Sequence, residues 1–319
     1  MYNYRSKFAP YMVEMLDFKE QLGYVKITHG PSLRNFDRYC VELYPETNAL
    51  SEKLVLSWLE KRSDENSGGL KKRANTIRQF GKYLCYTGKD AYVLPIGYIG
   101  GNSAFVPYNF TDEELGLFFH AADSFPESQY APCRHYVVSV FFRLLYCCGL
   151  RPNEGRLLMV EDVDLQSGQI LINGTKKNRD RIVMMSDDML SLCIRYDDIL
   201  KELAPDRTFF FPNPQGGAYA PNTMIHFFHK CWRSATSNSV LSRSPRIYDL
   251  RHRFSATVLM NWMDSGRDVQ ALLPHLSAYM GHAKLSATAY YIHLLPSNLI
   301  KSAAIDWSRF SDLIPEVMT

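Results

Sequence analysis

A segment rich in glycine and proline, residues 94–110, limits the folds open to this chain more than any other feature. It reads LPIGYIGGNSAFVPYNF and has neither helical nor strand periodicity, whereas the regions on both sides do. Segments of this composition commonly join domains. With 319 residues the chain is long enough for two hydrophobic cores. We therefore expect one domain over residues 1–93, a linker over 94–110 and a second domain over 111–319.

The first domain is predicted to be helical throughout. Apolar residues recur at helical spacing in several runs, separated by Pro45, Asn48 and the Gly68-Gly69 pair. Glycine and proline interrupt helices, so each break marks a connection. The predicted helices cover residues 8–23, 32–43, 51–61 and 70–86.

The second domain is predicted to contain several capped helices. Thr111, followed by three acidic residues, is typical of a capped helix start. An apolar run over residues 131–148 indicates a buried helix that ends at Gly149. Ser186 and Ser286 are predicted N-caps of later helices.

A strand pattern occurs in one place in the second domain. Two short runs, residues 169–173 and 181–185, are apolar or alternating and flank a turn at Gly174. They predict an antiparallel hairpin among helices. The expected fold class is therefore mainly α with a small antiparallel β-sheet (α+β).

The composition excludes several classes of protein. Charged residues make up 22% and hydrophobic residues 46%, which fits a globular chain and not a disordered one. We find no apolar run of 18 residues and no signal peptide, so we expect a cytoplasmic protein without a membrane partner. The seven cysteines form no Cys-x-x-Cys pair, which favours a reducing compartment. The net charge of +3 is small, so any nucleic-acid surface must come from local clustering.

One predicted helix of the first domain concentrates positive charge. The helix over residues 70–86 combines an apolar stripe with five basic side chains. Such a helix can follow DNA phosphates or enter a major groove, while a solvated surface helix is the alternative for a charged face taken alone. The candidate DNA-binding residues are Lys71, Lys72, Arg73, Arg78 and Lys82.

Four short motifs of the second domain carry basic and hydroxyl side chains in a defined order. Each alone is explained as well by ordinary surface charge or by a structural ion pair. Together they supply guanidinium groups, which donate paired hydrogen bonds to phosphate oxygens, and a phenol that can act as a nucleophile. In chain order the motifs are GLRPNE at 149–154, TKKNRDR at 175–181, YDLRH at 248–252 and MGH at 280–282, followed nine residues after His282 by Tyr291.

In order and spacing these motifs resemble those of the tyrosine recombinase (phage integrase) family. They cover nearly the whole second domain, whereas the first resembles the family's helical core-binding domain only in size, helix number and its basic last helix. The resemblance implies a core-binding domain and a catalytic domain that form a C-shaped clamp around DNA. The catalytic residues that it implies are Arg151, Lys176, Tyr248, Arg251, His282 and Tyr291.

The resemblance also implies a role for each residue. Arg151, Arg251 and His282 would stabilise negative charge on the phosphate. Tyr291 would attack phosphorus and leave a 3′-phosphotyrosyl bond, while Lys176 would protonate the departing 5′-oxygen. This chemistry requires no metal and no cofactor.

The implied function is site-specific recombination or integration, for a mobile element, in the bacterial nucleoid. Double-stranded DNA would be the partner, and four copies of the chain would form a homotetramer in the synaptic complex that passes through a Holliday junction. Two alternatives share the fold or the chemistry: a DNA-binding protein that does not cut, and a type IB topoisomerase.

Several assignments stay open. Tyr248 stands where the family most often has histidine, and a phenol mostly donates hydrogen bonds, so the proton acceptor is undecided. Lys177 is an alternative to Lys176, and Tyr290 to Tyr291. The apolar C-terminal stretch over 297–317 could pack within its own chain or on a neighbouring protomer.

Overall fold

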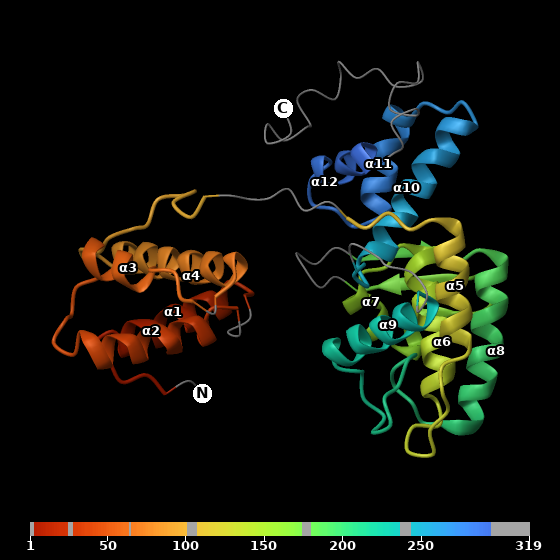
Figure 1. The fold of residues 1–319 in the computed structure, drawn as a ribbon, viewed down its shortest axis with the longest axis horizontal. Coiled ribbons are helices and arrows are strands. Elements are labelled where there is room, and N and C mark those ends of the chain that lie inside the picture. Colours follow the sequence, from red (N-terminus) through yellow and green to blue (C-terminus); the bar gives the residue numbers. More distant parts are fainter. Residues whose placement is uncertain are drawn as a thin grey trace. The chain divides into compact units, whose positions relative to one another are not determined.

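The chain forms two compact units, Met1–Ser103 and Ala104–Thr319, in the computed structural model (Figure 1). The boundary between the units falls inside the predicted linker, residues 94–110. No helix in the described part of the chain is long and apolar enough to cross a membrane. The structure describes residues 3–24, 28–63, 65–100, 107–173, 180–236 and 244–294.

The first unit is helical, as its periodicity predicts. Ser51 and Asn66 act as N-caps, because their side chains accept hydrogen bonds from the backbone nitrogens of Leu54 (3.3 Å) and Gly69 (2.8 Å). The predicted helices are confirmed, with ends that differ by a few residues. They are α1 (Ala9–Gln21), α2 (Gly30–Leu43), α3 (Glu52–Trp58) and α4 (Ser67–Tyr86).

Aromatic side chains form the core of the first unit. The ring of Phe36 lies 5.4 Å from that of Trp58 and 6.4 Å from that of Phe80, and Phe8 lies 6.0 Å from Phe36. All four side chains are at most 2% exposed. Helices as short as α1, α2 and α3 are marginal alone in water, so the aromatic cluster supplies the packing that holds the unit together.

The basic residues of α4 do not share one exposed face. Lys72 and Lys82 are exposed, but Arg73 is only 6% exposed. Its guanidinium forms an ion pair with Glu65 and donates a hydrogen bond to the carbonyl oxygen of Trp58, the last residue of α3. Contrary to expectation, Arg73 is therefore not part of an exposed basic face, because its donors are used within the unit.

The second unit is built around the apolar helix α6 (Arg134–Cys148), in which Phe141, Phe142 and Leu144 are fully buried. Helices α5, α8 and α10 pack directly against α6, and α9 packs on α5 (Figure 1). Their bounds are α5 (Asp112–Asp123), α8 (Asp187–Leu203), α9 (Pro221–Ala235) and α10 (Asp249–Asp264).

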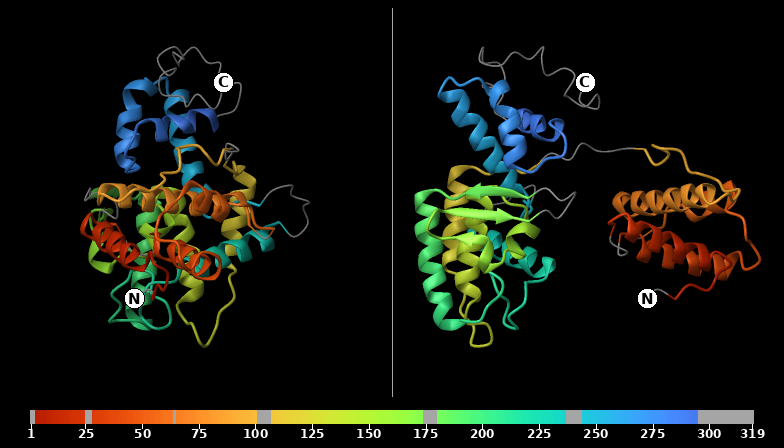
Figure 2. Two further views of the ribbon diagram at one scale, coloured as in Figure 1. Left: turned by 90° about the vertical axis from the view of Figure 1, so that its left-hand side faces the viewer. Right: turned by 180° about the vertical axis from the view of Figure 1, so that it is seen from behind.

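A three-stranded antiparallel sheet, drawn as arrows in Figure 2, follows in the order β1 (Val163–Asp164), β2 (Gln169–Ile172) and β3 (Arg181–Met184). Ile170 pairs with Val183, and both are completely buried. The predicted hairpin is thus confirmed, and so is the mainly α fold class with a small antiparallel sheet. The register of this sheet matters for the site, because it places Arg181 at the start of β3.

The remaining elements complete the second unit. Thr111 forms the predicted capping box, and Ser186 caps α8 as predicted. Ser286 is not an N-cap; Leu285 holds that position, one residue earlier, and Ser286 is the first helical residue. The elements are α7 (Pro152–Arg156), the 3-10 helix η2 (Val160–Asp162), α11 (Val269–Tyr279), α12 (Ser286–Ala289) and the 3-10 helix η3 (Tyr290–Leu294).

Gly149 ends α6 and directs the chain into the candidate site. Its φ of +62° lies in the left-handed region, where a side chain is strained. A Cβ atom there would also lie 2.4 Å from Cδ1 of Phe254 on α10. Glycine therefore allows α6 to stop sharply against α10, which brings Arg151 toward the start of that helix.

Candidate active site

Arg251, in the first turn of α10, is completely buried. It donates hydrogen bonds to the carbonyl oxygens of Gly149 (2.6 Å) and Met280, and to Nε2 of His282 (3.2 Å). Burial, and then the charge of Arg151, lowers its pKa. Arg251 thus joins three segments that are far apart in the sequence.

A buried carboxylate, that of Glu154 in α7, holds the other two arginines. It accepts hydrogen bonds from Nη1 of Arg151 (2.6 Å) and from both terminal nitrogens of Arg181 (3.0 and 2.7 Å), and lies 3.8 Å from Arg251. Burial alone would raise the pKa of Glu154, but hydrogen bonds from Arg181 and Arg151 lower it to about 2. One negative charge therefore serves three positive charges, and the cluster keeps an excess of about two positive charges.

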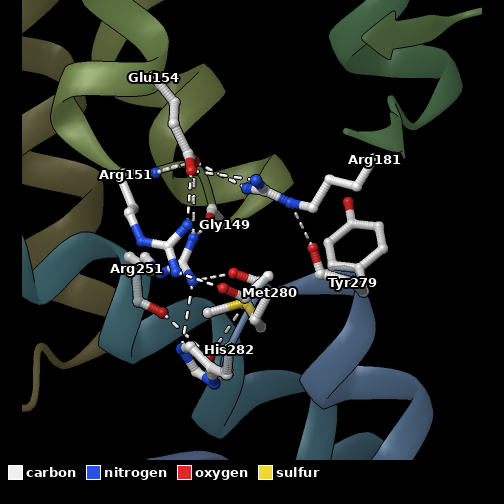
Figure 3. A network of polar contacts seen from close by, with 10 residues as sticks. Gly149, Arg151, Glu154, Arg181, Arg251, Tyr279, Met280 and His282 are labelled. Atoms are coloured by element: carbon white, nitrogen blue, oxygen red, sulfur yellow. Dashed lines mark hydrogen bonds and ion pairs between the residues drawn. The ribbon is translucent and has the colours of Figure 1, made fainter. Parts of the chain in front are cut away.

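The same three arginines cap the C-terminal end of α11, as Figure 3 shows. The last carbonyl groups of a helix have no partner within it and carry partial negative charge. Here three successive carbonyls each accept a hydrogen bond from a different arginine. The pairs are Arg181 with Tyr279 (2.8 Å), Arg251 with Met280, and Arg151 with Gly281 (2.7 Å).

His282 follows this helix end and is neutral. Its Nε2 accepts from Arg251, since a guanidinium only donates; the ring proton is therefore on Nδ1, which donates to Oγ1 of Thr288 (2.7 Å). Burial, followed by the charges of Arg251 and Arg151, lowers its pKa to about 3. Both ring nitrogens are thus engaged in this structure.

Tyr291, in η3, lies against two imidazole rings. Its ring centroid is 5.9 Å from that of His282 and 5.3 Å from that of His252. The residue is only 3% exposed, and burial raises the pKa of its phenol while the charge of Arg251 opposes that rise. Tyr290 lies beside it, at a ring distance of 6.3 Å, and is partly exposed.

Of the remaining predicted site residues, the structure describes Tyr248 but not Lys176. Tyr248, directly before α10, is partly buried, and its ring lies 5.2 Å from that of His252. Burial would lower the pKa of Arg151, but Glu154 and then Tyr248 raise it. Lys176 and its alternative Lys177 lie outside the described residues.

Three partners in the site were not assigned by sequence reasoning. Arg181 entered it only as the last residue of a motif, yet it binds Glu154 and caps α11. Thr288 fixes the His282 ring, and His252 lies against Tyr291. A sequence signal for Arg181 was present, because strand alternation places its side chain on the inward face at the start of a predicted strand. Thr288 had no such signal, because its contact with His282 depends on the turn between them.

Gly281 lies at the centre of the arginine cluster. Its φ is +62°, and a Cβ atom there would lie 3.1 Å from Nη1 of Arg181 and 3.3 Å from Nη1 of Arg151. Any side chain would press on both guanidinium groups. The motif glycine is therefore explained by backbone conformation and by close approach.

Chemically, the site is a cationic pocket beside a phenol. Fork-shaped donors and neutral imidazoles suit an oxyanion such as phosphate, and Arg151, whose side chain is 30% exposed, is the most open of the three arginines. Among the described residues no group of three or more His, Cys, Asp or Glu side chains could hold a metal ion.

Comparison with known proteins identifies the family. The model of the phage integrase family matches residues 109–298, more than half of the chain. The chain therefore belongs to this family, and the tyrosine recombinase (phage integrase) membership predicted from the motifs is confirmed.

Individual relatives agree with this assignment. The chain is 26% identical over 313 residues to a protein of Sinorhizobium fredii (strain NBRC 101917 / NGR234) named as an integrase/recombinase, y4rB; the match covers 93% of this chain and 96% of that protein. The XerH site-specific recombinase bound to a palindromic difH substrate has the same fold, with a TM-score of 0.66, 21% identity and coverage of 89% and 80%. A lambda integrase tetramer bound to a Holliday junction gives a TM-score of 0.63, 13% identity and coverage of 88% and 76%.

Proposed function

We propose that this chain is a site-specific recombinase that breaks and rejoins duplex DNA through a covalent bond between Tyr291 and phosphorus. One observation carries the proposal: Arg151, Arg181 and Arg251, from separate segments, converge at the end of α11, and His282, which Arg251 binds, lies against the ring of Tyr291. Such a cluster is costly to assemble unless it serves an anion. A scissile phosphate, whose oxygens gain charge during attack, is the anion that fits a phenol nucleophile.

Exposure and hydrogen bonding support the roles that we propose for the two arginines. Arg151, the most open guanidinium, binds a non-bridging phosphate oxygen first, and Arg251 stabilises the charge that develops behind it. Tyr291 attacks phosphorus and forms a 3′-phosphotyrosyl bond, which keeps the bond energy for rejoining. Lys176 protonates the departing 5′-oxygen, and Tyr248 donates a hydrogen bond to the phosphate.

The burial of Tyr291 sets a condition on this reaction. At 3% exposure Tyr291 is almost fully covered in the described conformation. Phosphate binding at Arg151 and Arg251 competes for the donors that now hold the end of α11. DNA binding is therefore coupled to a change in the contacts at the end of α11.

The partner is double-stranded DNA. The exposed Lys72 and Lys82 of α4 contact phosphates, with Lys71 on the same helix, while Arg78 is directed to the carbonyls of Leu94 and Pro95 (both 2.8 Å). Each of the two units binds the duplex. Four copies act as a homotetramer through a Holliday junction, in support of which the fold is shared with a lambda integrase tetramer on such a junction. The setting is recombination of a mobile element in the bacterial nucleoid.

A nicked suicide substrate tests the proposal. Loss of the short fragment below the nick prevents rejoining, so the wild-type chain should accumulate as a covalent adduct with DNA. Tyr291→Phe should give none, and Tyr290→Phe, the matched control, should give the wild-type amount. Adduct formation by Tyr291→Phe would overturn the assignment. Sites for the substrate come from sequencing DNA trapped by the wild-type chain.

A further inference from the structure

His252 is a buried imidazole beside the nucleophile to which no role has yet been given. It follows Arg251 in α10, its side chain is 13% exposed, and its ring contacts those of Tyr291 (5.3 Å) and Tyr248 (5.2 Å). Its Nδ1 is buried and has no hydrogen-bond partner among the residues that the structure describes. Unpaired buried polar atoms are rare and need an explanation.

The reaction needs a proton acceptor near the Tyr291 hydroxyl. His282 is poorly suited, because its Nε2 accepts from Arg251 and its Nδ1 donates to Thr288. Arg151 and Arg251 only donate, and a phenol such as Tyr248 is a weak acceptor of a proton near neutral pH. Among these neighbours, the unpaired ring nitrogen of His252 is the remaining candidate.

A buried carboxylate lies beside the His252 ring. Asp249, one turn earlier and 1% exposed, has its Oδ1 4.0 Å from Nε2 of His252. A carboxylate on that side favours the tautomer with the proton on Nε2, which leaves a lone pair on Nδ1. Burial lowers the pKa of His252 to about 4, against the opposite effect of Asp249, so the ring is neutral near pH 7.

We propose that His252 is the proton acceptor for Tyr291, oriented by Asp249, in a carboxylate–imidazole–phenol arrangement. The inference rests on the proposed cleavage reaction. The O–H bond of Tyr291 breaks and its proton moves to Nδ1 of His252, while the phenol oxygen forms a bond to phosphorus. The bond from phosphorus to the 5′-oxygen breaks, and that oxygen takes a proton from Lys176. On rejoining, the 5′-hydroxyl attacks and the phenol recovers its proton from His252.

This role also explains how the chain works with tyrosine at position 248, because the acceptor sits one helical turn further along α10. The protonated ring would be stabilised by Asp249 and destabilised by the arginines, so it returns the proton readily. The titratable and charged groups around His252 are Asp249, Arg246, Arg251, Tyr248, His282 and Tyr291.

The test distinguishes the proton transfer from Tyr291 from the one to the 5′-oxygen by changing the leaving group. Single-turnover adduct formation is measured on a substrate with the ordinary 5′-oxygen and on one with sulfur in its place, since a thiolate leaves without a proton. His252→Gln should slow adduct formation at least about 100-fold on both substrates. Lys176→Ala should be slow only with oxygen. His135→Gln is the matched control, because His135 also has an unpaired buried Nδ1 and lies 4.0 Å from a carboxylate, that of Glu127; it should react as wild type.

Each outcome decides a different claim. No adduct with the wild-type chain would contradict the recombinase function itself. A wild-type adduct together with equally fast reaction of a folded His252→Gln variant would overturn only the role of His252. If that variant does not fold, the ring tautomer decides, measured by nitrogen-15 NMR on the full wild-type chain at pH 7. A neutral ring protonated on Nε2 supports the proposal, and protonation on Nδ1 contradicts it.

Discussion

Both units bury an arginine against the end of a helix, but they use it differently. In the first unit Arg73 donates to the carbonyl of Trp58 at the end of α3, and in the second Arg251 donates to that of Met280 just after α11. Each guanidinium satisfies helix-end carbonyls that would otherwise be unpaired in the interior. Burial and hydrogen bonding alone therefore do not distinguish a structural arginine from a functional one.

The difference lies in charge compensation. Among the described residues Glu65 forms an ion pair with Arg73 alone, so the charge of Arg73 is balanced within the first unit. Arg251 lies 3.8 Å from a carboxylate that it shares with two other arginines. The first arrangement is neutral and stabilises local structure; the second keeps excess positive charge where an anion can be bound.

The largest expected effect comes from replacing each buried arginine by lysine, which keeps the charge but loses the planar set of donors. Arg251→Lys should reduce adduct formation on the suicide substrate by about 100-fold or more. Arg73→Lys should lower the free energy of unfolding by about 1–3 kcal/mol and leave the adduct rate per folded molecule unchanged. Similar losses of adduct rate in both variants would remove the distinction between the two arginines.

An intermediate effect is expected from the shared carboxylate. The pKa of Glu154 is about 2 in the folded chain against an ordinary 4.5, so folding favours its ionised form. This contribution, about 3 kcal/mol, is present above pH 4.5 and is lost as the pH falls from about 4.5 to 2. In urea unfolding experiments, the free energy of unfolding of the wild type should therefore fall as the pH is lowered over that range. In the Glu154→Gln variant it should change less steeply with pH. An unchanged slope in the variant would contradict the account of Glu154.

The smallest effect compares two glycines that follow helices. Gly88, after α4, has φ +78° and open space around its Cα, whereas Gly281 has φ +62° and two guanidinium groups close by. Gly88→Ala should cost about 1 kcal/mol of stability from backbone strain alone. Gly281→Ala should cost at least as much and also slow adduct formation about tenfold, because it displaces Arg151 and Arg181. Equal adduct rates would show that the guanidinium positions are not critical.

Much of the fold was predictable because local rules determine it. Helical periodicity located the helices of the first unit, and strand alternation located β2 and β3. Ser286 was misplaced by one residue, since a serine before a helical run looks the same as its cap or as its first residue.

The site was only partly predictable. The motifs predicted Arg151, Arg251, His282 and Tyr291 as site residues, because their spacing is a family pattern. In the structure His282 contacts both Arg251 and Tyr291. The burial of Arg73, by contrast, depends on where the end of α3 meets α4, and no periodicity encodes that contact. The sharing of Glu154 among three arginines likewise follows from tertiary packing.

The central claim is that Tyr291 is the nucleophile served by this cationic cluster, whose charge Glu154 compensates only in part. Tyr290 and Tyr291 are adjacent, so loss of activity on substitution is less direct than locating the bond itself. The most direct measurement is fragmentation mass spectrometry of the protease-derived peptide that carries nucleotide after trapping on the suicide substrate. The account predicts the nucleotide on Tyr291 through a 3′-phosphate; a nucleotide on Tyr290, or a 5′-phosphate linkage, would contradict it.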